Sequence, residues 1–419
     1  MANRILLALA LLAGTLSCKE RRTTPAGTES AVLALPGDSA TSPVASRDFS
    51  AIAEKVVGQN AGVKEGDVVL IFGSDEDLPL AEEIAIEVRK RGGSPLVSVG
   101  TRRLERRMYD EVPAKYDGQT PAANLKLAGI VDVVIGTESG EGRTLKGVPA
   151  ERMAARAKAE APVDALMRKR GVRTVFLGNG LYPTAERAEQ FGVSRDELAD
   201  MMYGGVDADY DAIHAIGERV QAVLAGGKEL RITNPNGTDL RVGIARRPIT
   251  VSDGIISAED RKKGGTANSV WLPAGEVFLT PVPGTANGTV VTDEDYFQGD
   301  RVEGLRLELK NGRMTSMTAK SGIEQLQGFY DAAGPGKDVV GVIDIGINTG
   351  VKAPEGSPLR VWSRAGTVTV GVGNNSWAGG DNQVNFAVFG SAPNSTVTVD
   401  GKPLVQDGKL VAAQKLAER

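Results

Sequence analysis

Short apolar runs alternate with amphipathic stretches through the first half of the chain. The run Asp-Val-Val-Leu-Ile-Phe at 67–72 is almost continuously apolar, which is typical of a strand buried on both faces of a parallel sheet. Residues 78–91 then show helical spacing and end in basic residues, which suit the negative end of a helix dipole. Further strands and helices are expected, in chain order, at 95–100, 102–112, 131–136, 149–170, 173–177 and 207–224. This alternation predicts an open, mainly parallel α/β sheet.

Two short motifs predict where helices start. Ser194 is followed three residues later by Glu197, and Ser321 by Glu324. In such a capping box the serine hydroxyl and the glutamate carboxylate each bond a backbone N–H at the start of the helix, satisfying two donors that would otherwise be unpaired. We therefore expect one helix to open at Ser194 and another at Ser321.

The pattern becomes β-rich after Gly227. Asn-Gly or Asp-Gly pairs at Asn236, Asn311 and Asp400 lie between short strand-like segments, and such pairs favour the tight turns of β-hairpins. The second half is therefore expected to be an antiparallel or mixed β domain with one or two helices. The predicted fold is an N-terminal open, mainly parallel α/β domain at 48–227, followed by a β-rich α+β domain at 228–412.

The first 47 residues differ in composition from the rest. Residues 1–17 hold one basic residue, an eight-residue apolar run and small residues, which is typical of a bacterial export signal and too short for a membrane-spanning helix. Leu16-Ser17-Cys18 resembles the lipobox of bacterial lipoproteins, whose cysteine is acylated; the alternative is an ordinary signal peptide. Residues 18–47 have the composition of a flexible linker. We expect an exported cell-envelope protein, anchored in the outer membrane by a lipid on Cys18.

Composition excludes several classes of chemistry. The 419 residues include 49 Lys and Arg against 53 Asp and Glu, which offers no broad basic surface for nucleic acid. A single Cys and a single His exclude an internal disulfide, a cysteine-based zinc site and any metal site that needs two imidazoles. The one histidine, His214, lies on a predicted helix, where a structural role is far more common than metal ligation.

Several segments share motifs with one peptidase family. The most specific is Leu272-Pro-Ala-Gly-Glu-Val-Phe278, and others are Val63-Lys-Glu-Gly-Asp67, Asn287-Gly-Thr-Val290 and Gly366-Thr-Val-Thr-Val-Gly-Val-Gly373. On these motifs the chain resembles the M29 metallopeptidases, the aminopeptidase T family, over nearly all of residues 50–410. The resemblance implies an α/β domain, a β-rich domain with the active site, and a homodimer that encloses this site. It also implies release of N-terminal amino acids by two divalent ions that activate water and the scissile carbonyl.

Most metal ligands that the resemblance implies are absent. The family's site uses two glutamates, two histidines, an aspartate and a nearby tyrosine. Glu276 matches the first glutamate, but Val342 stands at the position of the second glutamate. Thr369 stands at the position of the first histidine. Asn385 stands at the position of the second histidine, and Ala387 at that of the aspartate. With one ligand of five retained, we expect a catalytically degenerate member that needs no metal cofactor.

An all-oxygen metal site is the alternative. Asp344 lies two positions after Val342, so on a strand it points to the same face as the missing glutamate. Glu276 and Asp344 are therefore the candidate ligands for a divalent cation such as Ca²⁺, Mg²⁺ or Mn²⁺. Further oxygen donors would come from Asn375, Asp381, Asn382 and Asn385. The competing interpretation gives these carboxyls a structural role only.

Two functions follow from these alternatives. The first is an inactive relative, lipid-anchored in the envelope, that works as a binding or assembly protein and holds a peptide or amino-acid-like ligand between its domains. The second is an active hydrolase with a remodelled oxygen-ligand site. A ring-opening oxygenase on the same fold would also need histidine ligands, and the single histidine excludes it.

Overall fold

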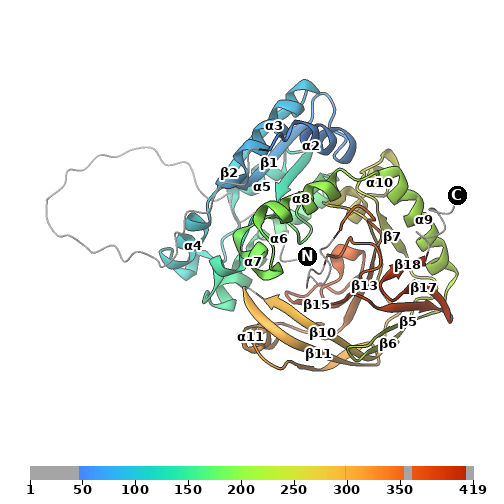
Figure 1. Ribbon diagram of the computed structural model, residues 1–419. Coiled ribbons are helices and arrows are strands. Elements are labelled where there is room, and N and C mark those ends of the chain that lie inside the picture. The colour runs from blue at the N-terminus through green and yellow to red at the C-terminus, as the bar shows by residue number, and fades with distance from the viewer. Residues whose placement is uncertain (1–46, 298, 353–360, 412–419) are drawn as a thin grey trace, which may run out of the picture.

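A parallel sheet forms the centre of the first half of the molecule (Figure 1). The computed structural model describes residues 47–297, 299–352 and 361–411. In this sheet all neighbouring strands are parallel and the order is β2-β1-β3-β4-β8. The strands are β1 (Val68–Ser74), β2 (Ser94–Gly100), β3 (Val133–Thr137), β4 (Arg173–Leu177) and β8 (Ser269–Leu272). The predicted open parallel sheet is confirmed, and its fifth strand comes from beyond residue 227.

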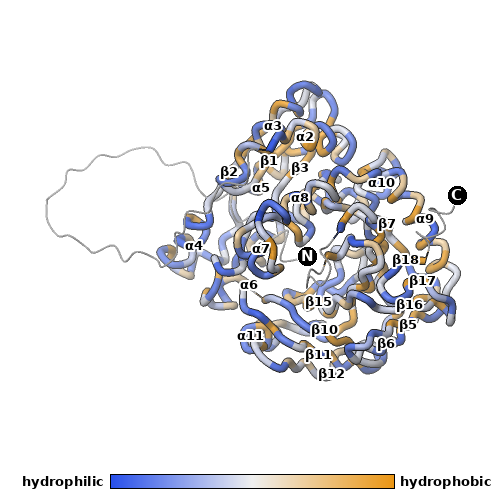
Figure 2. Tube along the Cα trace, viewed as in Figure 1, coloured by the Kyte–Doolittle hydropathy of each residue, from blue (hydrophilic) through white to orange (hydrophobic). Residues whose placement is uncertain are grey.

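Helices cover both faces of the parallel sheet. Successive residues of a strand point to opposite faces, so Ile71 packs in a cluster with residues of α2, α3 and α8, whereas Phe72 packs with residues of α5 and α6. Hydrophilic residues of α4 lie at the periphery (Figure 2). The helices are α2 (Ser50–Lys55), α3 (Leu78–Lys90), α4 (Arg102–Asp110), α5 (Ala122–Ala128), α6 (Ala150–Arg170), α7 (Ala185–Phe191), α8 (Arg195–Val206) and α9 (Tyr210–Gly226).

The β-rich half contains two sheets. The larger has the order β12-β11-β10-β6-β5-β16-β17-β18, and the smaller has the order β15-β14-β13-β9-β7. The larger sheet contains β5 (Glu229–Asn234), β6 (Thr238–Gly243), β10 (Asn287–Phe297), β11 (Asp300–Lys310), β12 (Arg313–Thr318), β16 (Thr396–Val399), β17 (Lys402–Gln406) and β18 (Lys409–Leu410). The smaller contains β7 (Ile249–Ser252), β9 (Glu276–Leu279), β13 (Val340–Gly346), β14 (Val368–Gly373) and β15 (Ala387–Ala392).

The smaller sheet has two different faces. One face presents aliphatic residues such as Val277, Ile343 and Val370, which share a core with Val290 of the larger sheet. The opposite face carries an aromatic cluster and the two carboxyl groups discussed below. Among the described residues, this half also contains the helices α10 (Ala258–Lys263) and α11 (Glu324–Ala332).

The hairpin predictions are confirmed and one helix start is wrong. Asn236, Asn311 and Asp400 lie in the turns of the β5–β6, β11–β12 and β16–β17 hairpins. Ser194 caps α8 as expected. In contrast, α11 begins at Glu324 with Ile323 at its N-cap. Ser321 does not cap it, because Ser321 pairs through its backbone with Glu303 of β11.

Several predictions fall on residues that the structure does not describe. The predicted signal peptide, Cys18 and the linker up to residue 46 lie outside the described ranges. Lipidation of Cys18 and the envelope location therefore stay predictions. Within the described ranges, no helix is long and apolar enough to cross a membrane.

Candidate functional site

Glu276 stands where the chain passes from the parallel sheet to the smaller sheet of the β-rich half. Leu272 ends β8 in the parallel sheet and Glu276 begins β9 in the smaller sheet. Gly275, between them, has φ +122°, and a Cβ here would lie 2.9 Å from the backbone nitrogen of Asn348. The turn therefore requires glycine. Glu276 is buried, with 1% of its surface exposed.

Asn179 holds Glu276 from the other half of the molecule. It lies in a Gly-Asn-Gly segment after β4, at the carboxyl end of a parallel strand, with φ +43°. Its Nδ2 donates to Oε1 of Glu276 at 2.8 Å and to the carbonyl of Pro273 at 3.0 Å. One amide thus ties the end of the parallel sheet to the beginning of β9.

We expect Asn179→Gly to lower the free energy of unfolding by about 1–3 kcal/mol, because two buried acceptors lose their donor. Glycine tolerates the positive φ, so the substitution isolates the loss of the amide. Urea unfolding would measure the change. The matched control is Asn394→Gly, since Asn394 also has positive φ, at 61°, but is exposed. Equal effects of both substitutions would contradict the bridging role of Asn179.

Asp344 lies on β13, beside β9. Asp344 is opposite Phe278 of β9 and Thr369 of β14. Glu276 precedes Phe278 by two residues on β9, so its side chain lies on the same face of the sheet as that of Asp344. Asp344 is 1% exposed, and neither carboxylate oxygen has a hydrogen-bond partner among the described residues. Burial, reinforced by the Glu276 carboxylate, raises the pKa of Asp344 well above its usual range, and the nearby N–H of Ile345 offsets only part of this. We therefore expect Asp344 to be protonated at neutral pH.

An aromatic cluster packs on the same face. It contains Phe278, Val342, Trp362, Trp377 and Ala378, with Phe389 packed against them. The ring centroid of Trp377 lies 5.4 Å from that of Phe278, 6.4 Å from that of Trp362 and 6.5 Å from that of Phe389. Trp271 of β8 adds a contact at 6.5 Å from the parallel sheet. The carboxyl pair thus shares this face of the sheet with a cluster of packed rings.

The remaining predicted positions lie in different surroundings. Val342 is a fully buried member of the aromatic cluster. The hydroxyl of Thr369 is 3.0 Å from that of Ser391 on β15. Ala387 lines the cavity described below, whereas Asn385 is exposed and lines a second cavity. The structure therefore groups Val342, Thr369 and Ala387 on one face and separates Asn385 from them.

The amides that were expected to join the carboxyls instead close the loop between β14 and β15. Asn375 Oδ1 accepts a hydrogen bond from the backbone N–H of Asn382 at 2.8 Å. The Nδ2 of Asn382 donates to the carbonyls of Gly336 and Gly373 at 2.9 and 2.8 Å. Asp381 is exposed. Such side-chain bonds to nearby backbone are a common use of Asn in turns.

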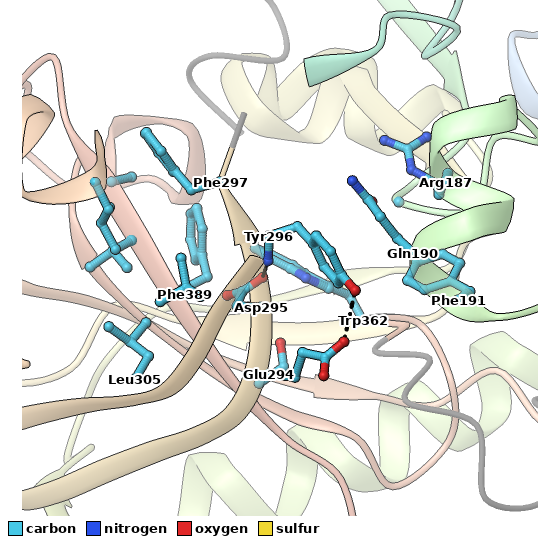
Figure 3. Close-up of a pocket in the computed structure, with 16 residues that line it drawn as sticks. Arg187, Gln190, Phe191, Glu294, Asp295, Tyr296, Phe297, Leu305, Trp362 and Phe389 are labelled. Atoms are coloured by element: carbon cyan, nitrogen blue, oxygen red, sulfur yellow. Dashed lines mark hydrogen bonds between the residues drawn. The ribbon is translucent and has the colours of Figure 1, made fainter. Parts of the chain in front are cut away.

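A cavity of about 270 Å³ opens beside the aromatic cluster, between the two halves of the molecule (Figure 3). One side is formed by Arg187, Gln190 and Phe191 of α7, and the other by Glu294, Asp295, Tyr296 and Phe297 of β10. Trp362, Phe389 and Ser391 also line it. A row of three side chains leads from the cavity to the carboxyl pair. Ser391 is opposite Thr369, and Thr369 is opposite Asp344, on neighbouring strands.

The cavity carries opposite charges on its two sides. Glu294 accepts a hydrogen bond from the Tyr296 hydroxyl at 2.8 Å and pairs with Arg301 at 2.5 Å. Oδ1 of Asp295 accepts the backbone N–H of Tyr296 at 2.8 Å. Across the cavity, Nη1 of Arg187 contacts two backbone carbonyls, at 3.4 and 3.5 Å. Acidic groups on β10 thus face a guanidinium on α7.

Comparison with known proteins places this chain in a family. A sequence model described as thermophilic metalloprotease (M29) matches residues 45–336. The chain belongs to the M29 peptidase family. Wild-type AmpT from Thermus thermophilus has a TM-score of 0.67 at 18% identity, covering 87% of this chain and 98% of that one. No curated protein matches the chain.

A second solved structure shows how varied the chemistry of this fold is. The 2,5-dihydroxypyridine dioxygenase of Pseudomonas putida KT2440 has a TM-score of 0.55 at 15% identity, covering 87% of this chain and 97% of that one. At such identities both likenesses establish the fold alone. Since the two names describe different reactions, the function of this M29 member must be argued from its own residues.

The residues at the M29 site do not fit a pair of divalent ions. Each ion would need about four or more ligands. Within the described ranges, no group of three Asp, Glu, His or Cys side chains is arranged so that it could hold a metal ion. His214 lies on α9, with its Nδ1 2.7 Å from Asp253. We therefore derive no catalytic step through metal ions. Glu276 and Asp344 do lie on neighbouring strands of one face, and their ligation of a single cation stays a prediction.

Sequence reasoning did not identify four residues of this M29 site. Asn179 had a usable signal, because Gly178-Asn-Gly180 follows a parallel strand, where ligand sites of α/β sheets commonly form. Arg187 and Asp295 lie far apart in the chain, and nothing local predicts that they face one cavity. Trp377 belongs to the aromatic cluster, whose members come from segments far apart in the chain.

Proposed function

We propose that this M29 member binds amino-acid-like or peptide ligands in the cavity between α7 and β10 and does not hydrolyse them. It would act as a binding protein at the bacterial cell envelope, held there by the lipid predicted on Cys18. The observation that carries the proposal is the aromatic cluster, which fills the face where the family's metal ligands are expected. The cavity beside the cluster supports it, because it remains open between the two halves.

The charges of the cavity suit a zwitterion. A carboxylate would be met by the guanidinium of Arg187, and an ammonium group by the carboxylate of Asp295. Apolar side chains would pack against Phe191, Trp362 and Phe389. The volume of about 270 Å³ lies just below that of typical small-molecule sites, about 300–1,000 Å³, which favours a small ligand. A free amino acid or the end of a short peptide is the ligand class that these properties favour.

Leucine and leucine amide distinguish this ligand class. The amide lacks the carboxylate, so the wild type should bind it about 10–100-fold more weakly, as expected for loss of a charge-assisted hydrogen bond. In Arg187→Gln the two ligands should bind equally weakly. Trp362 lines the cavity, so tryptophan fluorescence can report binding. Arg107→Gln is the control, since Arg107 is an exposed residue of α4 paired with Glu111. Preference for leucine that survives Arg187→Gln would contradict the assignment.

Hydrolysis is tested with metal present. We expect less than one ion per chain after exposure to Zn²⁺, Co²⁺, Mn²⁺ and Ca²⁺, and no release of N-terminal residues from leucine p-nitroanilide. Two ions per chain together with release would overturn the proposal.

The second candidate function is a hydrolase with an oxygen-ligand site. The unpartnered oxygens of Asp344 beside Glu276 favour it, because buried carboxylate oxygens without partners are suited to a cation. This candidate requires a tightly held ion and hydrolysis, and both must be lost in Glu276→Gln while the protein stays folded. An active Glu276→Gln variant would exclude it.

A further inference from the structure

A second cavity lies away from the M29 site. Its volume is about 450 Å³, within the range of small-molecule sites. Helices α4 and α6 and the segment 112–122 form most of its wall, and Phe329 of α11 and Asn385 close it from the β-rich half. Its apolar lining is provided by Met108, Val112, Tyr116, Leu145 and Met153. None of the residues that line the proposed amino-acid site lines it.

Two carboxyls from different helices face this apolar lining. Glu160 of α6 is 6% exposed, and its Oε1 accepts a hydrogen bond from Asn124 at 3.2 Å. Its Oε2 has no partner among the described residues. Glu105 of α4 lines the same cavity. Neither carboxyl forms an ion pair within the described part of the chain, which is rare for acids in such surroundings.

The nearby guanidinium groups are committed elsewhere. Arg152 and Arg156 both donate to Asp117, at 2.5 and 2.7 Å. Both also donate to backbone carbonyls of the segment 108–112. Arg156 stacks over the ring of Tyr109 at 3.8 Å. Asp117 therefore balances part of their charge and the carbonyls hold them in place, so Glu105 and Glu160 keep no direct cationic partner.

We propose that this cavity binds a small organic amine, with its ammonium group at the carboxylates of Glu160 and Glu105 and its apolar body against the methionines and Tyr116. An anion would add a third negative charge beside the two acids, and a neutral apolar molecule would leave Oε2 of Glu160 unpartnered. A bare metal ion would leave the apolar part of the cavity empty. An ammonium with a hydrocarbon body satisfies both parts, because the carboxylates meet the charge and the thioethers suit the hydrocarbon body. This site is independent of the proposed amino-acid site.

Binding should also depend on pH. Burial raises the pKa of both Glu105 and Glu160 to about 7. The positive charges of Arg156 and Arg102 partly lower the pKa of Glu105, whereas the negative charge of Asp164 raises the pKa of Glu160 further. Asp117, which also lines the cavity, is paired with Arg152 and Arg156, and Phe329 and Asn385 from the β-rich half carry no charge. Since an ammonium needs ionised carboxylates, affinity should rise from pH 6 to pH 8.

Titration calorimetry of the full folded protein with 2-phenylethylamine tests the proposal. The neutral isostere 2-phenylethanol and the anion 3-phenylpropionate are measured beside it. We expect the amine to bind at least tenfold more tightly than the alcohol, as for a charge-assisted contact, and the anion to bind most weakly. Glu160→Gln keeps the acceptor for Asn124 and should remove the preference for the amine, as should Glu105→Gln. Glu82→Gln, an exposed residue of α3, should change nothing.

Two further variants keep the test decisive. Ala157→Phe, which fills the cavity without changing charge, should abolish binding of both amine and alcohol. Asp295→Asn removes an acid of the other cavity and should leave amine binding unchanged. Equal affinity for amine and alcohol, or an amine preference that survives both glutamine substitutions, would overturn the proposal. So would loss of amine binding in Asp295→Asn alone, which would assign the amine to the other cavity.

Discussion

Replacing Trp377 by alanine should lower the free energy of unfolding by about 3–5 kcal/mol, the usual cost of removing a large buried aromatic side chain. The reason is its central place in the aromatic cluster, where it is 7% exposed and contacts the rings of Trp271, Phe278, Trp362 and Phe389. Its loss would leave a hollow beside the carboxyl pair and weaken the contact between the two halves. Urea unfolding at constant pH measures the change.

Trp377→Phe is the matched variant. Nε1 of Trp377 has no hydrogen-bond partner among the described residues, so phenylalanine removes volume but breaks no hydrogen bond. We expect it to cost clearly less than alanine does. If both substitutions cost the same, or if alanine costs less than about 1 kcal/mol, the cluster does not hold the halves together as described.

Asp344→Asn should stabilise the protein at pH 7.5 and have little effect near pH 4. The folded-state pKa of Asp344 is raised, mainly by burial, whereas the unfolded chain ionises near the ordinary value of about 3.9. Above that pH the unfolded state releases the proton first, so wild-type stability falls as pH rises, by up to about 1.4 kcal/mol per pH unit. Asparagine removes this dependence.

Unfolding measured at both pH values checks this result. Asp381→Asn provides the control, because Asp381 is exposed on the nearby loop and should show no such dependence. The opposite result, destabilisation by Asp344→Asn that grows with pH, would mean that an ionised Asp344 is bound by a cation. That outcome would support the hydrolase alternative.

Local patterns in the sequence predict most of the fold. The apolar runs at β1 and β4 mark strands buried on both faces, and the Asn-Gly and Asp-Gly pairs mark hairpins, because turn geometry restricts the residues that fit. The wrong helix start at Ser321 also came from a local pattern, the capping box. The backbone of Ser321 instead pairs with that of Glu303, so the serine does not cap the helix. Tertiary contacts thus override a short motif where both compete for one backbone segment.

The candidate site was predictable only in part. The two-residue period of a strand correctly puts Asp344 on the face of Val342 and beside Glu276. The aromatic cluster and both cavities depend on segments that meet only after folding, such as α7 with β10. Side-chain amides were expected at the carboxyls, but Asn382 instead donates to the backbone carbonyls of Gly336 and Gly373.

The position of β8 limits how this protein can be divided or rearranged. A gene fragment that ends at residue 227 encodes four strands of the parallel sheet but omits β8, whose partner is β4. The edge of β4 would then expose unpaired backbone groups and apolar side chains, a surface that invites aggregation. The first 227 residues therefore do not form an exchangeable module, and recombination that separates them from residues 269–272 should yield an insoluble product.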